Sequence, residues 1–395
     1  MHSVEKWIPV WRCVPIDYNQ NLGTLEDISQ KCVFTNNIAG TQLRVRFNNL
    51  YSQSPMTIDR VAVALHNRET GLVSPRHPIT YQGSTCIQLP PSTQPYSDPV
   101  DLAVTPQDDI LLYLYFGHAT VLRSVCTTST GIGWQSVHQT GNFWATDALG
   151  FTIKEQLVPP LAHDPYPLFF AAGVCEVSVL AGDDVQLITL FGDSITHMCY
   201  FMDPFQEQLY RRFPGKYAVV NAGISGNRIQ KNHPLCPGFP GEGNQFGVAG
   251  KDRFQTDVYG GAEPDIVFIM EGVNDCTHSL CFSEPDVPTA QDIFDALSDV
   301  VSQAKAHGSR VYISTISPFG AFGDQWREQA ETLRCTYNVL IRQSHIADGI
   351  VDMDAATRDP RDVHRMQEGF HLGDGVHPNW KGGSRMADAL MQALF

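Results

Sequence analysis

A change of rhythm near residue 184 constrains the fold of this 395-residue chain more than any other feature. Beyond it, five apolar runs alternate with helical patterns, at 185–191, 217–220, 265–270, 310–315 and 349–353. Helical periodicity follows at 289–307, 324–344 and 384–394. Apolar runs of this kind are typical of parallel strands buried on both faces. The alternation predicts a doubly wound α/β sheet with its sites at the carboxyl ends of the strands.

The first half has a different pattern. Short runs with period-2 alternation or β-rich composition lie at 42–47, 58–65, 110–116 and 174–179, with turn signals between them. Many short strands at this spacing predict an antiparallel β-sandwich or jelly roll. We therefore predict two domains, a β-sandwich/jelly-roll-like accessory domain at 1–183 and an α/β domain at 184–395.

The charge balance excludes some partners. Lys and Arg number 27 and Asp and Glu 42, so the net charge is −15. This acidity argues against nucleic acid and anionic membranes as partners, because both attract a basic face. The first residues lack a basic end followed by an apolar run, so no secretion signal is predicted and a cytoplasmic protein is expected. The ten cysteines are then expected to be thiols rather than disulfides.

The first block that could carry chemistry is Phe191–Thr196, directly after an apolar strand. Ser194 would lie at a strand-to-helix turn, with its hydroxyl exposed and its backbone N–H able to face an oxyanion. Taken alone, the block is better explained by an ordinary serine that caps the next helix.

Two further blocks follow the next two strands. In Asn221–Arg228, a glycine lets a backbone N–H approach a ligand closely. In Glu271–Asp275, the amide of Asn274 could donate a hydrogen bond to an oxyanion. Taken alone, each block is better explained as a turn.

The fourth block, Asp374–Pro378, precedes the last helical pattern. An Asp three residues before a His can reach the imidazole Nδ1–H, which leaves the other nitrogen as a base for a serine hydroxyl. His371 precedes the aspartate and is set aside. A solvated loop His beside a turn Asp remains the alternative.

Together, the four blocks occur in the order Ser, Gly, Asn, Asp/His, and they resemble the SGNH hydrolase family, also called the GDSL esterase/lipase family. The resemblance covers about residues 184–395. It implies a flavodoxin-like α/β/α fold of five parallel strands, and it implies no metal or cofactor. By this resemblance the nucleophile, the base and its orienting carboxylate are Ser194, His377 and Asp374. The oxyanion hole would be formed by the N–H groups of Ser194 and Gly226 and the side chain of Asn274.

Three further segments, 43–49, 252–254 and 317–319, are similar to the two-domain xylan-esterase-like branch of that family. This likeness implies hydrolysis of esters, often of acyl groups on carbohydrate. The prediction is a serine esterase acting on small acyl, above all acetyl, esters of a small-molecule carbohydrate. A lipase or thioesterase on the same scaffold, or a non-catalytic carbohydrate-binding protein, are the alternatives.

Substrate contacts are predicted for Asn227, His278 and Trp380, although a hydrogen-bonded surface His and a packed aromatic would look the same. The Gly- and Pro-rich stretch 227–263 is expected to be a loop that shapes the pocket. A Cys276-x-His278-x-x-Cys281 cluster offers three ligands, whereas structural zinc takes four, so no metal site is predicted.

The β-rich half allows two interpretations. As a carbohydrate-binding module it would expose aromatics on one face, with Tyr81, Tyr96 and Trp134 as candidates. As a structural partner it would bury an edge against the hydrolase domain and build the dimer contacts of a homo-oligomer; this second interpretation is preferred.

Overall fold

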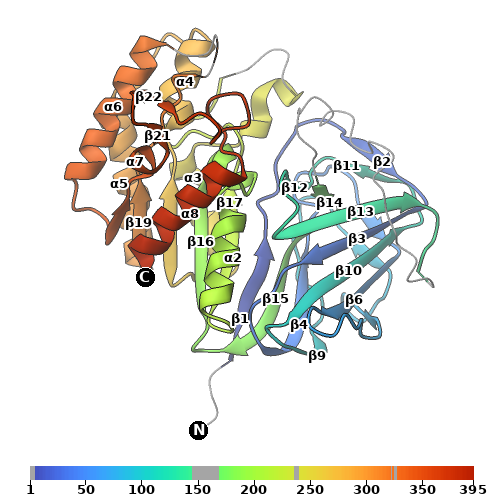
Figure 1. Ribbon diagram of the computed structural model, residues 1–395. Coiled ribbons are helices and arrows are strands. Elements are labelled where there is room, and N and C mark those ends of the chain that lie inside the picture. Colours follow the sequence, from blue (N-terminus) through green and yellow to red (C-terminus); the bar gives the residue numbers. More distant parts are fainter. Residues whose placement is uncertain (1–4, 145–168, 235–239, 322, 324–326) are drawn as a thin grey trace. The chain divides into compact units, whose positions relative to one another are not determined.

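Figure 1 shows a computed structural model of the chain, which describes residues 5–144, 169–234, 240–321, 323 and 327–395. The chain divides into two compact units, Met1–Gln186 with Phe213–Val220, and Leu187–Arg212 with Asn221–Phe395. The division along the chain at 186/187 lies three residues beyond the predicted boundary, and the short segment 213–220 is assigned to the first unit. Each unit is described by itself.

The first unit is built from antiparallel sheets, as predicted. Its two larger sheets have the strand orders β1-β15-β4-β9 and β13-β3-β10-β6-β7. The strands are β1 (Glu5–Arg12), β2 (Gly23–Leu25), β3 (Ile28–Phe34), β4 (Gly40–Phe47), β5 (Met56–Ile58), β6 (Arg60–Asn67), β7 (His77–Pro78), β8 (Ile87–Leu89), β9 (Val100–Val104), β10 (Asp108–Phe116), β11 (Thr120–Leu122), β12 (Cys126–Thr128), β13 (Trp134–Thr140), β14 (Phe169–Ala171) and β15 (Val174–Gly182). Three of the four predicted runs lie entirely within one strand each, namely within β4, β10 and β15. Most of the fourth run, 58–65, lies in β6.

The three aromatics proposed for carbohydrate capture make contacts inside this unit. Trp134 is only 5% exposed, and its ring lies 5.2 Å from that of Trp11. The Tyr96 hydroxyl donates to Glu176 at 3.0 Å, and Tyr81 packs edge-on to another ring. Trp134 therefore belongs to the core and not to an exposed binding face, whereas Tyr81 and Tyr96 are half-buried.

The second half carries the predicted five-stranded sheet, in the order β17-β16-β18-β19-β20. Its strands are β16 (Gln186–Gly192), β17 (Tyr217–Gly223), β18 (Ile266–Met270), β19 (Arg310–Ser314) and β20 (Gly349–Val351). Strands β16, β18, β19 and β20 pair in parallel, and β18 is buried along its whole length. A short hairpin adds β21 (Arg358–Asp359) and β22 (Asp362–Met366).

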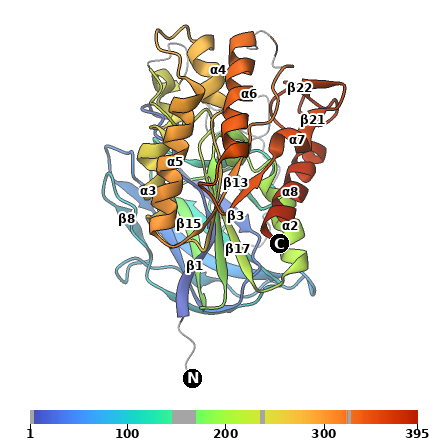
Figure 2. The same cartoon turned by 90° about the vertical axis from the view of Figure 1, so that its left-hand side faces the viewer.

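The helices form two groups by their contacts, α2, α7 and α8 in one and α3 to α6 in the other. They give the predicted three-layer α/β/α architecture (Figure 2). Their bounds are α1 (Ser194–His197), α2 (Met202–Arg212), α3 (Gly250–Tyr259), α4 (Val273–Cys281), α5 (Ala290–Ala306), α6 (Glu328–Gln343), α7 (Met353–Thr357) and α8 (Trp380–Leu394). The predicted apolar face of α5 is buried, and a capping box of Thr289 and Asp292 begins that helix.

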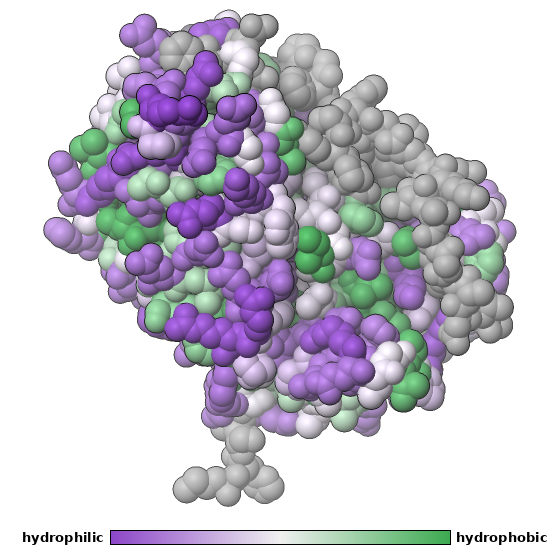
Figure 3. Space-filling view, viewed as in Figure 1, coloured by the Kyte–Doolittle hydropathy of each residue, from purple (hydrophilic) through white to green (hydrophobic). Residues whose placement is uncertain are grey.

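In the view of Figure 3, hydrophilic and hydrophobic residues are interspersed over the helices of the second half. Within the described ranges, no helix is both long enough and apolar enough to span a bilayer. Several cysteine thiols are buried in the cores. Burial raises the pKa of the Cys175 thiol to about 12.

Candidate active site

The sheet order brings three of the four blocks to one edge. Strand β16 lies between β17 and β18, so the segments that follow these three strands are neighbours at their carboxyl ends. The register pairs Gly192, the last residue of β16, with Met270, the last of β18. In open α/β sheets, ligands bind where the strand order reverses in this way.

Ser194 is half-buried at the start of α1, where the Asp193 side chain caps the helix by accepting the Ile195 N–H at 3.0 Å. Its Oγ lies 2.8 Å from Nε2 of His377. Nδ1 of the same ring lies 2.7 Å from Oδ2 of Asp374. Ser194 lies 183 positions before His377, and Asp374 lies three positions before it. The three side chains nevertheless form one hydrogen-bonded chain.

The Asp374 carboxylate is held in a single orientation. Its other oxygen, Oδ1, accepts the backbone N–H groups of Val376 and His377, both at 3.0 Å. Burial raises the pKa of Asp374, but the contact with His377 and these N–H groups outweigh it and lower the pKa to about 2. The ionised carboxylate keeps the imidazole proton on Nδ1, so Nε2 is free to accept the proton of Ser194. His371, set aside above, accepts two backbone N–H groups of the same loop.

The block after β17 folds into a tight turn. The Asn227 N–H donates to the carbonyl of Ile224 at 3.1 Å, and Gly226 has φ +75°. Such a turn with a positive φ at its third residue alone is type II. A Cβ on Gly226 would lie 2.0 Å from the ring of Phe246, so both backbone and space require glycine here.

Asn274, at the start of α4, reaches this turn. Its Nδ2 donates to the carbonyl of Asn227 at 2.9 Å. An amide nitrogen carries two N–H groups, so the second can serve an oxyanion. The structure therefore brings Asn274 to the turn that carries Gly226.

Asn227 itself was predicted to contact substrate, but it is 0% exposed. Its Nδ2 donates to the carbonyls of Phe246 and Val248, and its Oδ1 accepts from Arg253. A side chain with every polar atom used inside the fold holds the turn in place and does not reach a ligand. The stretch 227–263 is likewise not one long loop, because α3 forms within it; its residues 235–239 lie outside the described residues.

His278 lies against a histidine that the sequence did not single out. Its Nδ1 is 2.9 Å from Nε2 of His233, and that same Nε2 is 2.9 Å from the carbonyl of Gly226. Burial lowers the pKa of His233 to about 4 and the pKa of His278 well below its usual value. A carbonyl oxygen can only accept, so His233 Nε2 carries a proton and donates it to Gly226. Trp380, in contrast, is 48% exposed at the first position of α8, as contact with a ligand requires.

Arg253 connects the strand ends beneath the site and is 4% exposed. Its guanidinium donates to the carbonyls of Gly192 at 3.0 Å and Ala222 at 2.8 Å. It also donates to Asn227 Oδ1 and pairs with Glu271, which lies directly after β18. One side chain thereby binds the ends of β16, β17 and β18 together. Sequence reasoning placed Arg253 in a family-like segment and predicted no role for it.

Replacing the buried carboxyl group of Asp193 should change how stability depends on pH. Burial raises the pKa of Asp193 to about 7, so the folded protein keeps a proton that the unfolded chain releases. The contribution of Asp193 to the free energy of unfolding should therefore fall between about pH 4 and about pH 7, by up to about 1.4 kcal/mol per pH unit. Asp193→Asn keeps the oxygen that caps α1 and lacks this fall. Urea unfolding at several pH values would show it, with the exposed Asp388→Asn as control; parallel curves for Asp193→Asn and wild type would contradict the expectation.

One trio within the described part of the chain brings three metal-ligating groups together, Glu331, Cys335 and His364, with atoms within 4.8 Å of one another. Both carboxylate oxygens of Glu331 accept from Arg334, a fixed cation that competes with any metal ion. The trio Cys276, His278 and Cys281 does not converge in this way among these residues.

Comparison with known proteins finds one family model that matches part of the chain. Residues 190–384 match the model of the GDSL-like Lipase/Acylhydrolase family. No curated protein matches the chain. Solved structures similar to it include a catalytic mutant of Axe2, an acetylxylan esterase from Geobacillus stearothermophilus (20% identity, 53% of this chain and 94% of that one, TM-score 0.40). Others are the acetyl xylan esterase AlAXEase (23%, 53% and 100%, 0.39) and TesA (18%, 53% and 98%, 0.37).

Proposed function

The second half of this chain is a GDSL-like lipase/acylhydrolase domain, and from that premise we propose that the protein is a serine esterase acting through Ser194, His377 and Asp374. The observation that carries the proposal is the hydrogen-bonded chain from Ser194 Oγ through both ring nitrogens of His377 to Asp374. A serine hydroxyl is a weak nucleophile until an adjacent base accepts its proton.

In the proposed mechanism, Ser194 Oγ attacks the ester carbonyl carbon while His377 Nε2 accepts the hydroxyl proton. The tetrahedral oxyanion accepts hydrogen bonds from the N–H groups of Ser194 and Gly226 and from the Asn274 amide. His377 then gives its proton to the leaving alkoxide, and the C–O bond to the alcohol breaks. Water repeats the sequence on the acyl-enzyme, releasing the carboxylic acid and restoring Ser194.

We further propose that the substrate is a small, chiefly acetylated, carbohydrate. The support is the similarity of several sequence segments to the xylan-esterase-like branch. The exposed indole of Trp380, three positions after His377, offers a surface on which a sugar ring can stack. A neutral acylated sugar needs no charge steering, which is compatible with the net charge of −15.

A series of acyl chains tests this substrate class. We expect the kcat/KM for 4-nitrophenyl acetate to be at least about tenfold above that for the octanoate ester. A small acyl pocket discriminates by this much because each extra methylene group must be accommodated in it. Acetylated xylo-oligosaccharides should release acetate, measured against Ser194→Ala as the blank. A preference for octanoyl esters or acyl thioesters would instead identify a lipase or thioesterase on the same catalytic residues.

A further inference from the structure

His197 holds the turn that carries Gly226, although no part of the proposed reaction uses it. It is the last residue of α1, which begins with Ser194, and it is only 2% exposed. Its Nδ1 lies 3.2 Å from the backbone nitrogen of Ser225 and 2.8 Å from Ser225 Oγ. A backbone N–H can only donate, so Nδ1 carries a lone pair, and the Ser225 hydroxyl donates to it as well.

The backbone around His197 is fixed as firmly as its ring. Its N–H donates to the carbonyl of Asp193 at 2.8 Å, and its carbonyl accepts from Asn221 Nδ2 at 3.3 Å. Asn221 Oδ1 in turn accepts the N–H of Gly223. A Cβ on Gly223 would lie 2.5 Å from the His197 nitrogen, so glycine permits this close approach. The end of α1 is thus attached to the end of β17, and the imidazole extends from this junction to Ser225.

The conformation of the turn decides where the Gly226 N–H points. Type I and type II turns differ by a flip of the central peptide, here the one between Ser225 and Gly226. Glycine accepts the φ of either type, so residue 226 alone does not select between them. Contacts hold the atoms on either side of this peptide, with His197 on the N–H and hydroxyl of Ser225 and His233 on the carbonyl of Gly226.

We propose that His197 is a positioning residue that holds Ser225 and thereby aims the Gly226 N–H into the oxyanion hole. This inference rests on the proposed function, since it matters only if that N–H stabilises an oxyanion. It also links the nucleophile to the oxyanion hole, because Ser194 and His197 are the two ends of one helical turn.

Three variants test the inference. His197→Ala removes the acceptor, and we expect kcat for 4-nitrophenyl acetate to fall by about 10²-fold, as for loss of one oxyanion donor, with KM nearly unchanged. His197→Asn places an amide Oδ1 near the position of Nδ1 and should recover at least about tenfold of that loss. Ser225→Ala keeps the backbone N–H contact and should cost less than His197→Ala. A small alkylboronic acid, which forms a tetrahedral adduct with an activated serine, should lose affinity in parallel with kcat.

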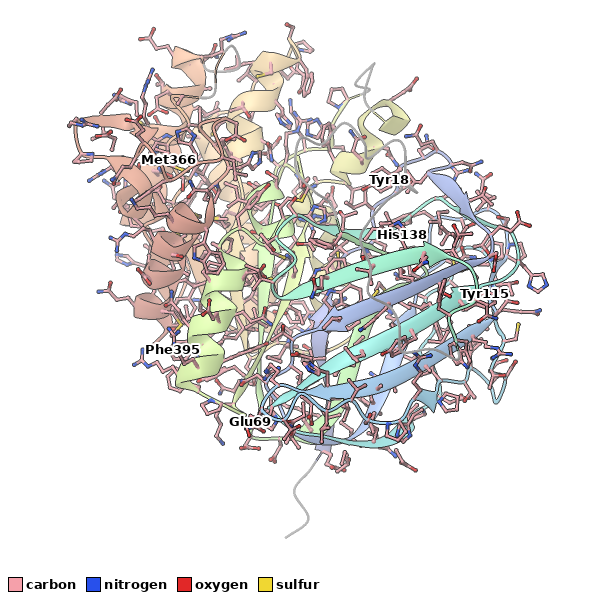
Figure 4. The ribbon with its side chains drawn as sticks, turned by 45° about the vertical axis from the view of Figure 1, so that its right-hand side comes forward. Tyr18, Glu69, Tyr115, His138, Met366 and Phe395 are labelled. Carbon is pink, nitrogen blue, oxygen red and sulfur yellow. The ribbon has the colours of Figure 1, made fainter. Side chains whose placement is uncertain are left out.

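The matched control is His138→Ala. His138 lies on β13 of the first unit (Figure 4), and it is also a buried histidine, 8% exposed, packed on the ring of Phe170. It should lower the melting temperature as His197→Ala does, while kcat and boronate affinity stay at wild-type values. Equal losses of kcat in both variants, or no recovery in His197→Asn, would reduce His197 to a structural residue and overturn the inference.

Failure of the inference and failure of the proposed function give different results. If wild type shows no Ser194-dependent hydrolysis, the proposed function is wrong, and the inference falls with it. Suppose instead that the wild type is active and that the folded His197→Ala variant keeps a kcat within about threefold of the wild type. That change is smaller than the tenfold that about 1.4 kcal/mol represents, and only the inference is then wrong.

Discussion

Ser194→Ala is expected to lower the turnover of 4-nitrophenyl acetate by about 10⁴-fold or more. The remaining activity is what the rest of the site supports without its nucleophile. The reason is that the substitution removes the atom that forms the acyl-enzyme bond, whereas the base and the oxyanion donors remain. Substrate should still bind, because no other contact is lost. Initial rates at saturating substrate measure the effect, and a fluorophosphonate probe should label wild type at Ser194 and leave the variant unlabelled.

Ser302→Ala is the matched control. The side chain of Ser302 is exposed on α5 and bonded to the carbonyl of Ser298, so the same atom is removed away from the sheet edge. It should keep full activity. If Ser194→Ala retained the wild-type rate, the assignment of the nucleophile would be wrong, and the non-catalytic carbohydrate-binding alternative would become the better explanation.

Asp374→Asn is expected to lower kcat by about 10⁴-fold. The substitution changes which imidazole nitrogen carries the proton and leaves the shape of the site intact. The amide oxygen can still accept the N–H groups of Val376 and His377. Its NH₂ group then faces Nδ1 and donates to it. The ring must therefore carry its proton on Nε2, where it cannot accept the proton of Ser194.

The pH profile separates this effect from misfolding. In the wild type the pKa of Asp374 is lowered to about 2, so the carboxylate stays charged throughout the range in which activity is measured. Loss of activity on acidification should then come from protonation of the imidazole base. Asp374→Asn should be slow at every pH, at a temperature at which it and the exposed control Asp388→Asn are both fully folded. A variant with more than about a tenth of wild-type kcat would contradict the assigned tautomer role, since a 10⁴-fold loss is expected.

Much of the second half could be predicted because its signals are local. Each buried parallel strand is a short apolar run, and each block of polar residues follows directly where a run ends, as at Ser194 and Asn274. Strand ends in an α/β sheet lie on one edge, so the residues did not need to be placed individually. The α/β/α fold and the position of the site at that edge follow from this pattern.

Sequence reasoning was wrong about residues whose roles depend on contacts with distant segments of the chain. Asn227 follows the turn glycine in sequence, yet carbonyls at 246 and 248 and the guanidinium of Arg253 occupy its side chain completely. Trp134 ends in the core of the first unit because Trp11, more than a hundred residues earlier, packs on its ring. Period-2 alternation shows which residues share a face and cannot show which face the core covers.

The amino-acid sequence by itself determined the α/β/α class of the second half, the antiparallel character of the first, and the order of the residues predicted to carry the reaction. Only the tertiary structure decided which groups hold those residues in their geometry. The histidines on either side of Gly226 and the buried arginine beneath three strand ends have no local signature, because a hydrogen bond between segments depends on where the chain returns in space. In our proposal, the direction of one peptide N–H, which glycine leaves open, depends on the contacts that His197 and His233 make on either side of it.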